Sequence, residues 1–299
     1  MTMYKCFGLK RIFSRAAVLI LLAAICCGAL FPLRYGISSA AEASAERPVP
    51  LPVIMYHSVC EKAPADYIVS PLQLENDLIW LKDHGYTSVS AQQLIDYTNK
   101  NGELPQKPVL ITFDDGFYNN LSIALPLLEK YDMCAIVSIV GKYTDDYAPA
   151  DPHADAYSYL TWEDISQLIA SNRIEIGSHT YDMHSRDSRR QGCAINPDET
   201  PEQYSYTLNM DIGLLNTELH DSCGISPVVF AYPFGALCRE SLPVLRDNGI
   251  KISLTCREGM NYITRSPDCL YGIFRNNRSG LVSTEEYMSE LTKELPESQ

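Results

Sequence analysis

Residues 109–116 have the sequence VLITFDDG, an apolar run that ends on two adjacent aspartates and a glycine. The run follows Pro108 and is rich in β-branched side chains, so we predict a short buried strand. Ligands of parallel α/β sheets bind at the carboxyl ends of strands, which is where Asp114 and Asp115 would lie. Gly116 would let the chain turn sharply there, so that both carboxylates face one pocket. A loop with two solvated acids is the alternative explanation.

Segments typical of strands and of helices alternate on both sides of this stretch. We predict strands at 53–57, 86–89, 109–113, 133–140, 173–178, 228–231, 250–254 and 270–274, and helices at 71–84, 91–98, 119–130, 161–171, 201–221 and 239–248. Such alternation indicates parallel strands joined by crossover helices. Seven or eight strands over roughly 250 residues predict a barrel-like α/β sheet. Residues 142–160 show neither the strand pattern nor the helix pattern, and we expect them to form a long surface loop.

The first 45 residues differ in composition from the rest of the chain. They begin with several basic residues, Lys5, Lys10, Arg11 and Arg15. An apolar run at 16–31 and small residues up to Ala45 follow, which is the layout of a secretory signal cut after Ala45. The run is also near the lower limit for crossing a bilayer, so an uncleaved N-terminal anchor is the second interpretation. We therefore divide the chain into an export segment, residues 1–45, and a folded domain, residues 46–299.

Charge and cysteine content narrow the possible functions of that domain. The export segment holds five basic residues and one acidic residue, so its removal changes the net charge from −13 to −17. A domain this acidic does not attract nucleic acid or anionic lipid, and it suits a neutral substrate or one that becomes cationic on reaction. Seven of the ten cysteines remain in the domain and none form a CxxC pair, which argues against a cysteine zinc site.

Three of the predicted strands end on side chains that can bind metal or transfer protons. They are His57, the pair Asp114 and Asp115, and His179, which is followed five residues later by His184. Two histidines and a carboxylate are a common ligand set for Zn²⁺ or another borderline divalent metal. A spacing of five separates side chains by about 140° on a helix, so this segment must be a loop or an irregular turn. The alternative is two histidines without a common ligand.

Three short motifs resemble those of a known family. TFDDG at 112–116, HTYDMH at 179–184 and YPFG at 232–235 are similar to successive motifs of the polysaccharide deacetylases, the NodB-homology domain of carbohydrate esterase family 4. The resemblance covers roughly residues 50–280. MYH at 55–57 and the histidine spacing are most similar to the branch that includes poly-N-acetylglucosamine deacetylases. The resemblance implies a deformed (β/α) barrel of seven or eight mostly parallel strands and hydrolysis of N-acetyl, in some members O-acetyl, groups.

The resemblance also implies roles by position. Asp114 would be the catalytic base, and the metal would be held by Asp115, His179 and His184. Zn²⁺ is the expected ion, with Co²⁺ and Ni²⁺ as alternatives. The backbone N–H of Phe234, the residue after the proline of the third motif, would stabilise the oxyanion.

Two departures from the family pattern concern the base and the acid. The family arginine that pairs with the base is replaced by Ala231, and Arg275 at the end of the strand at 270–274 could serve instead. The late histidine that acts as general acid is absent. His57 is the best substitute, because a closed barrel brings the first and last strands together; a structural histidine is the alternative.

We therefore expect an exported enzyme, secreted or anchored at the outer face of the cell membrane. It would remove N-acetyl groups from an N-acetylglucosamine-containing polysaccharide of the cell surface, cell wall or extracellular matrix. The expected partner is the glycan polymer, and no nucleic acid is expected to bind. Contact with a membrane would occur only through residues 1–45 if they are not cleaved. We expect the protein to be a monomer. A catalytically silent glycan-binding domain and an O-acetyl esterase are the alternatives. Tyrosines of the expected loop could stack on sugar rings, namely Tyr143, Tyr147, Tyr157 and Tyr159.

Overall fold

The computed structural model describes residues 47–147, 153–186 and 190–295. Residues Pro48–Gln299 form one compact unit. The expected export segment, residues 1–45, lies outside the described residues. Among the helices of the described ranges, none combines the length and the apolar character needed to cross a bilayer.

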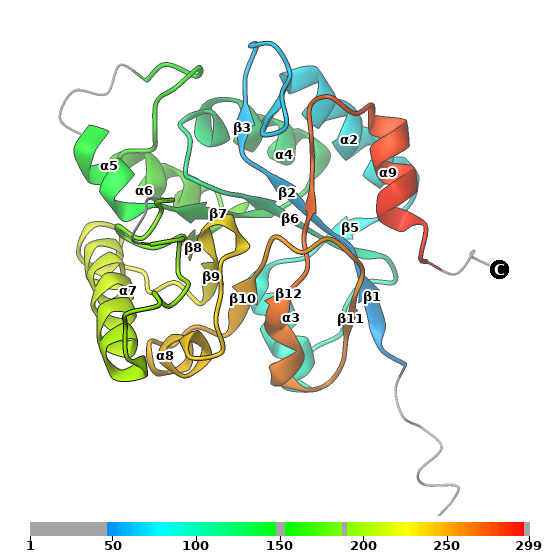
Figure 1. Cartoon of the computed structure of the whole chain (residues 1–299). Coiled ribbons are helices and arrows are strands. Elements are labelled where there is room, and N and C mark those ends of the chain that lie inside the picture. The colour runs from blue at the N-terminus through cyan, green and yellow to red at the C-terminus, as the bar shows by residue number, and fades with distance from the viewer. Residues whose placement is uncertain (1–46, 148–152, 187–189, 296–299) are drawn as a thin grey trace, which may run out of the picture. The chain divides into compact units, whose positions relative to one another are not determined.

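One curled sheet organises this unit (Figure 1). Its strands run in the order β12–β10–β9–β8–β7–β6–β2–β13, with β5 paired to β6 beside this path, and all their pairings are parallel. The bounds are β2 (Val53–Tyr56), β5 (Thr87–Ser88), β6 (Pro108–Phe113), β7 (Ala135–Ile139), β8 (Ile174–Ser178), β9 (Val229–Ala231), β10 (Ile252–Leu254), β12 (Tyr271–Ile273) and β13 (Asn276–Asn277). This arrangement confirms the predicted α/β fold of mostly parallel strands.

The two ends of the sheet path are consecutive in the chain. Strand β12 pairs with β10 at one end, and β13 pairs with β2 at the other. Only Phe274 and Arg275 separate the two strands. A linker of two residues can join the ends only if the sheet curls back on itself, so Arg275 lies where the curled sheet comes closest to closing.

Two smaller pairings lie outside the curled sheet. Strand β1 (Val49–Leu51) pairs antiparallel with β11 (Asn261–Ile263), and β3 (Ser58–Val59) pairs with β4 (Ile68–Val69). The β3–β4 pair follows directly after β2, so it adds a short wall beside the carboxyl end of that strand.

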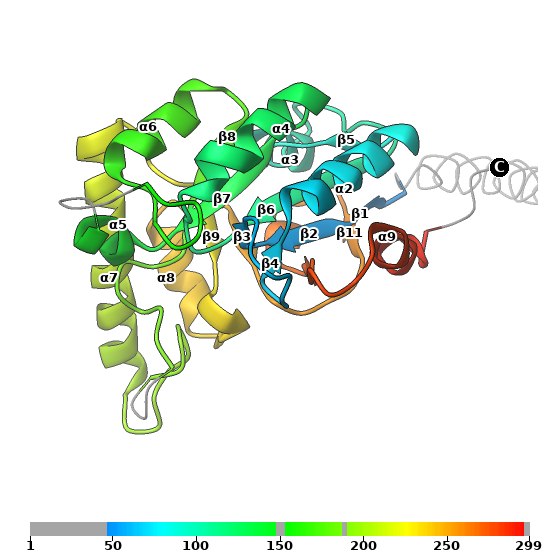
Figure 2. The same cartoon turned by 90° about the horizontal axis from the view of Figure 1, so that it is seen from above.

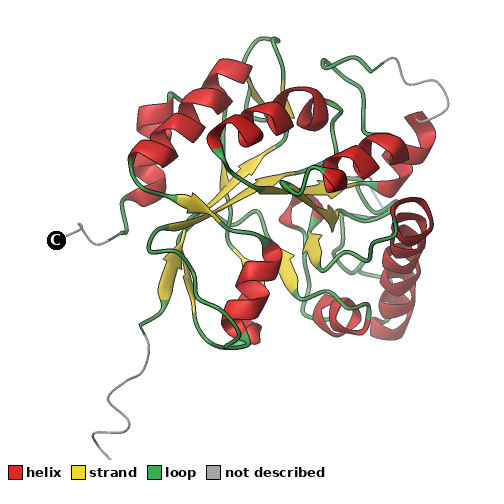
Figure 3. Cartoon of the chain, turned by 180° about the vertical axis from the view of Figure 1, so that it is seen from behind, coloured by secondary structure: helices red, strands yellow, loops and turns green. Residues whose placement is uncertain are grey.

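Most helices cover the sheet on its outer side (Figures 2 and 3), whereas α3 packs against the cluster on the inner face. Their bounds are α2 (Pro71–Asp83), α3 (Ala91–Thr98), α4 (Leu125–Tyr131), α5 (Gly141–Tyr147), α6 (Trp162–Ala170), α7 (Pro201–Cys223), α8 (Ser241–Asp247) and α9 (Thr284–Thr292). Strand β6 is buried on both faces: Ile111 belongs to the cluster under α2, α4 and α6, and Leu110 to the cluster on the α3 side. That explains why its sequence is a continuous apolar run instead of an alternating pattern.

Most helix starts agree with the sequence-based prediction. Thr161 and Asp164 form the expected capping box, in which the Asp164 carboxylate accepts from the Thr161 N–H at 3.0 Å and the Thr161 hydroxyl accepts from the Asp164 N–H at 3.2 Å. This reciprocal pair satisfies two backbone donors that the first turn of a helix otherwise leaves without partners.

Three predictions need correction. Residues 142–160 are not one loop, because Gly141–Tyr147 is helix α5. The predicted helix at 119–130 begins as a π-helical turn, η1 (Asn120–Ala124), before α4. The strand at 270–274 is not the last element, because β13 and α9 follow it.

Tertiary contacts explain why the local sequence does not predict helix α5. The N–H groups of Gly141 and Lys142 donate to the carbonyls of Thr180 and Tyr181 at 3.1 and 3.0 Å. These partners lie in the segment after β8, so the helix starts against a surface that the local sequence does not contain.

Candidate active site

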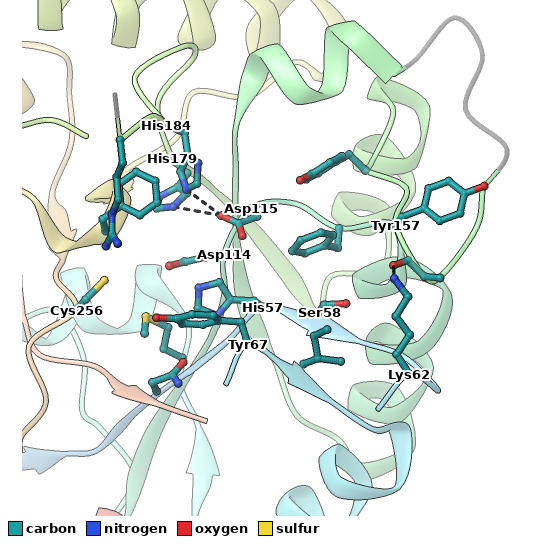
Figure 4. A pocket seen from close by; sticks show the side chains of 18 of the residues that line it. His57, Ser58, Lys62, Tyr67, Asp114, Asp115, Tyr157, His179, His184 and Cys256 are labelled. Carbon is teal, nitrogen blue, oxygen red and sulfur yellow. Dashed lines mark hydrogen bonds and ion pairs between the residues drawn. The ribbon is translucent and has the colours of Figure 1, made fainter. Parts of the chain in front are cut away.

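The carboxyl ends of the strands surround a cavity of about 890 Å³ (Figure 4). Strands β2, β6 and β8 and the turn after β9 each bring a side chain or backbone group to it. All six residues singled out from the sequence line this one cavity: His57, Asp114, Asp115, His179, His184 and Phe234. The structure therefore brings together motifs that lie up to 177 positions apart in the chain.

The backbone is strained where these motifs leave their strands. Asp115, Thr180 and Phe234 have positive φ values of 71°, 74° and 59°. Such values are uncommon outside glycine, and they concentrate at functional sites, where the surrounding structure compensates for their cost. Gly116 follows with φ 72°, which confirms the sharp turn expected after the two aspartates.

Three side chains form a possible metal site. Oδ1 of Asp115 lies 3.6 Å from Nε2 of His179 and 3.2 Å from Nε2 of His184. One ligand atom from each residue lies within 4.8 Å of the other two. Oδ1 is buried, and among the described residues it faces no polar group other than these two imidazole nitrogens, an arrangement that is costly for a carboxylate oxygen unless a cation or a proton lies between them. This donor set and its convergence fit a divalent ion such as Zn²⁺.

The orientation of His179 suits a ligand. Its Nδ1–H can donate to the carbonyl of Ala231 at 2.7 Å, which leaves Nε2 free to face Asp115. Burial lowers the pKa of His179, although the nearby carboxylates of Asp114 and Asp115 oppose that shift. The ring is therefore kept neutral, which is the form that binds a metal.

Asp114 lies beside this cluster and has a different partner. Arg275 donates from both terminal nitrogens to the two carboxylate oxygens, each at 2.7 Å. Burial alone would raise the pKa of Asp114, but Arg275 and His179 outweigh it and hold that pKa well below its usual range. Arg275 therefore makes the contact with Asp114 that was suggested for it in place of the family arginine. Ala231, which occupies the position of that arginine, accepts a hydrogen bond from His179 through its backbone carbonyl.

His57 reaches the cavity from the end of β2. Its Nδ1 is buried and has no hydrogen-bond partner among the described residues, and its ring lies edge-on to Tyr67 at 4.7 Å. Burial lowers the pKa of His57 more than the carboxylates of Asp114 and Asp115 raise it. The imidazole is therefore neutral near pH 7 and has an unused nitrogen.

Phe234 lies in the turn η3 (Pro233–Gly235) after β9. The two internal hydrogen bonds of this turn use the amides of Gly235 and Ala236, so neither of them occupies the N–H of Phe234. The Phe234 ring lies 4.5 Å from the His184 ring, and the Arg186 guanidinium lies 4.3 Å above it. The turn thus packs directly against a possible metal ligand.

The structure also reveals residues to which the sequence analysis gave another role or none. Tyr143, expected in a loop, lies on α5 with its hydroxyl 3.1 Å from Nδ1 of His184. Tyr67 and Tyr157 line the cavity and are 57% and 60% exposed. Arg186 is only two positions after His184, and that proximity was the one signal that could have identified it.

Comparisons with known proteins agree with this geometry. The family model described as polysaccharide deacetylase matches residues 101–253. A poly-beta-1,6-N-acetyl-D-glucosamine N-deacetylase of Escherichia coli is 24% identical over 241 residues, which cover 72% of this chain and 36% of that protein. An enzyme of the same name from Staphylococcus aureus is 24% identical over 204 residues, which cover 68% of this chain and 66% of that protein.

Among solved structures, the de-N-acetylase from Aggregatibacter actinomycetemcomitans has the same fold, with a TM-score of 0.68 and 23% identity. The match covers 81% of this chain and 99% of that chain. By contrast, the chain matches only about a third of the length of the Escherichia coli relative.

Proposed function

The chain belongs to the polysaccharide deacetylase family, and on that premise we propose that it is a metal-dependent hydrolase that removes N-acetyl groups from an N-acetylglucosamine-containing polysaccharide. The observation that carries the proposal is the pairing of two adjacent aspartates with different partners. Asp114 is held by Arg275, while Asp115 faces His179 and His184. One carboxylate is thus placed to accept a proton and the other to bind an ion.

Asp115, His179 and His184 would hold the ion, with Zn²⁺ favoured and Co²⁺ or Ni²⁺ as alternatives. When bound, the ion would polarise the amide carbonyl and lower the pKa of an attacking water, which a carboxylate of low pKa such as Asp114 requires. Three protein ligands leave coordination positions for water and substrate.

The base is the best-defined role. Asp114 would take a proton from water as the water attacks the acetyl carbonyl. Its two hydrogen bonds to Arg275 fix the plane of the carboxylate, so it meets the substrate in one orientation. Arg275 acts through Asp114 and is therefore a positioning residue.

Phe234 and His57 would complete the reaction. The N–H of Phe234 would donate to the oxyanion of the tetrahedral intermediate. His57 would pass a proton to the leaving nitrogen, and its unpartnered Nδ1 supports such a role. Because burial lowers the pKa of His57, the ring is neutral at the start, so the proton that Asp114 takes from the water would have to reach His57 before His57 passes it to the leaving nitrogen.

The cavity wall suits a sugar polymer. Tyr67 and Tyr157 offer exposed aromatic faces beside the site, and such faces can stack on sugar rings. The strongly acidic chain suits a neutral substrate whose product is a cationic amine. We place the enzyme outside the cell, exported by residues 1–45 as a monomeric catalytic domain of residues 46–299.

Acetate release tests the proposal. The purified protein is stripped of metal, reloaded with Zn²⁺, Co²⁺ or Ni²⁺, and incubated with N-acetylglucosamine oligomers or peptidoglycan fragments. Asp114→Asn is the test variant. Asp268→Asn removes an exposed carboxylate that pairs with Arg246 on the surface and is the matched control.

We expect metal-dependent acetate release that Asp114→Asn abolishes and Asp268→Asn preserves. Bound metal and bound glycan without acetate release would contradict hydrolysis and favour a silent glycan-binding domain. O-acetylated sugars are added as a third substrate, and acetate release from them alone would instead identify an esterase.

A further inference from the structure

Helix α5 is attached to the segment that carries both histidines. Besides the two backbone hydrogen bonds at its start, Lys142 forms an ion pair with Asp182 at 2.9 Å. Asp145 accepts hydrogen bonds from the Tyr181 hydroxyl at 2.7 Å and from the Trp162 indole at 2.9 Å. These contacts hold α5 in one position relative to residues 179–184.

From that position, Tyr143 contacts His184. Its hydroxyl lies 3.1 Å from Nδ1 of His184 and also donates to the His184 backbone carbonyl at 3.4 Å. The hydroxyl has one proton. If that proton is directed to the carbonyl, the oxygen presents a lone pair to Nδ1, and the ring must be the donor in the shorter contact. The protonated nitrogen is then Nδ1, and Nε2 is the free one.

This assignment places the free nitrogen at the metal site. Nε2 of His184 faces Oδ1 of Asp115 at 3.2 Å. His179 reaches the same state through a backbone carbonyl, that of Ala231. On this assignment the two histidines would present the same free nitrogen through different partners, a backbone carbonyl for His179 and a side chain for His184.

We propose that Tyr143 is a positioning residue that fixes the tautomer and ring orientation of His184 and so sets the affinity of the site for its metal ion. The inference deepens the proposed function, because it requires that Asp115, His179 and His184 bind a metal. Partners of this kind typically change metal affinity by about 10- to 100-fold. The tyrosine ring itself packs on Tyr159 at 4.7 Å, so replacing it with phenylalanine removes the hydroxyl and retains the packing.

Tyr143→Phe is the test variant, and Tyr181→Phe is the matched control. Tyr181 lies between the two histidines and loses its hydrogen bond to Asp145, but that hydroxyl has no contact with His184 in the structure. The dissociation constant for Zn²⁺ is measured for the full chain by competition with a chromophoric chelator. ¹⁵N NMR of the imidazoles reports which nitrogen of His184 is protonated.

We expect Tyr143→Phe to raise the dissociation constant for Zn²⁺ by about 10- to 100-fold and to increase the share of the Nε2–H tautomer of His184. Tyr181→Phe should keep the wild-type value. Wild-type affinity in Tyr143→Phe would overturn the inference. Equal losses of Zn²⁺ affinity in both variants would also overturn it. They would show that affinity depends on how well residues 179–184 are held in place and not on the Tyr143 hydroxyl. A wild-type protein that binds no Zn²⁺, Co²⁺ or Ni²⁺ would instead overturn the metal site itself, and the role of Tyr143 with it.

Discussion

Arg275 and Asp114 form a buried pair with two parallel hydrogen bonds of 2.7 Å, although 161 positions separate them in the chain. The side chain of Arg275 is fully buried and that of Asp114 is 2% exposed. Arg275 also donates to the carbonyl of Thr255 and to the hydroxyl of Thr112. The pair therefore joins β6 to the chain that links β12 and β13, and the proposed catalytic base is also part of the structural core.

Removing one member of this pair should affect stability and activity together. We expect Asp114→Asn to lose about 3–5 kcal/mol of unfolding free energy, because Arg275 then keeps a buried charge without its partner. The double variant Asp114→Leu/Arg275→Met should regain most of that stability and remain inactive. Urea unfolding and acetate release measured on the same samples would check this. A double variant as unstable as the single one would show that the charge is not the cause.

Loss of the His57 side chain should affect catalysis without affecting metal binding. We expect His57→Ala to lower turnover by about 10²- to 10⁴-fold, the usual contribution of a general acid. Metal content is measured by atomic emission on the same sample. A variant that folds but has lost its metal would make His57 a ligand and remove it from the proton-transfer step.

Metal removal should destabilise the protein. A ligand present at 100 times its dissociation constant stabilises the folded state by about 2.7 kcal/mol, so chelation should lower the melting temperature and Zn²⁺ should restore it. His179→Ala should melt at the same temperature with or without Zn²⁺. His220→Ala, which removes a side chain that is 70% exposed on α7, should respond like the wild type. Equal responses of the two variants would place the ion elsewhere.

A methyl group at Gly235 should disturb the turn that carries Phe234. The added Cβ would lie 2.9 Å from Cβ of Cys256 and 3.1 Å from its backbone nitrogen, at a φ of 66°. Gly224→Ala is the matched control, since Gly224 has a φ of 71° and nothing within 4 Å of an added Cβ. We expect Gly235→Ala to lose far more acetate release than Gly224→Ala. Similar losses would mean that backbone strain alone, and not the contact with Cys256, explains the effect.

The metal-free protein should become less stable as the pH falls below about 6.5. Burial lowers the pKa of both His57 and His179, so the unfolded chain binds protons near pH 6.5 that the folded chain does not bind. This contribution to stability is complete at pH values above the pKa of the histidines in the unfolded chain. It is lost as the pH falls from there towards their lower pKa values in the folded protein. Urea midpoints at pH 7.5 and 5.5 would measure the loss, and His57→Ala should show a smaller one. The same pH dependence in His57→Ala would exclude His57 as a contributor.

Local patterns were sufficient for much of the fold. The apolar run that ends at Asp114 predicted β6, and Thr161 with Asp164 predicted the start of α6. Both depend on interactions within a few residues, which sequence periodicity and capping rules describe. The turn at Gly116 belongs to the same class.

Other features depend on partners far away in the chain. Residues 141–147 contain glycine, threonine and two aspartates, which are weak helix formers, and they become helical against Thr180 and Tyr181. The contact of Tyr143 with His184 follows from that docking. The resemblance could only suggest Arg275 as the partner of Asp114, since no short-range signal links them.

The near closure of the sheet also sets the order in which the site can be completed during synthesis. The proposed ligands Asp115, His179 and His184 are all present once residue 184 has been made, and Phe234 follows 50 positions later. Arg275 comes last, between the two strands that end the sheet path. A nascent chain can therefore carry all three proposed ligands before the proposed base, Asp114, has its partner Arg275, so the proposed hydrolysis would have to wait until the curled sheet has joined its own ends.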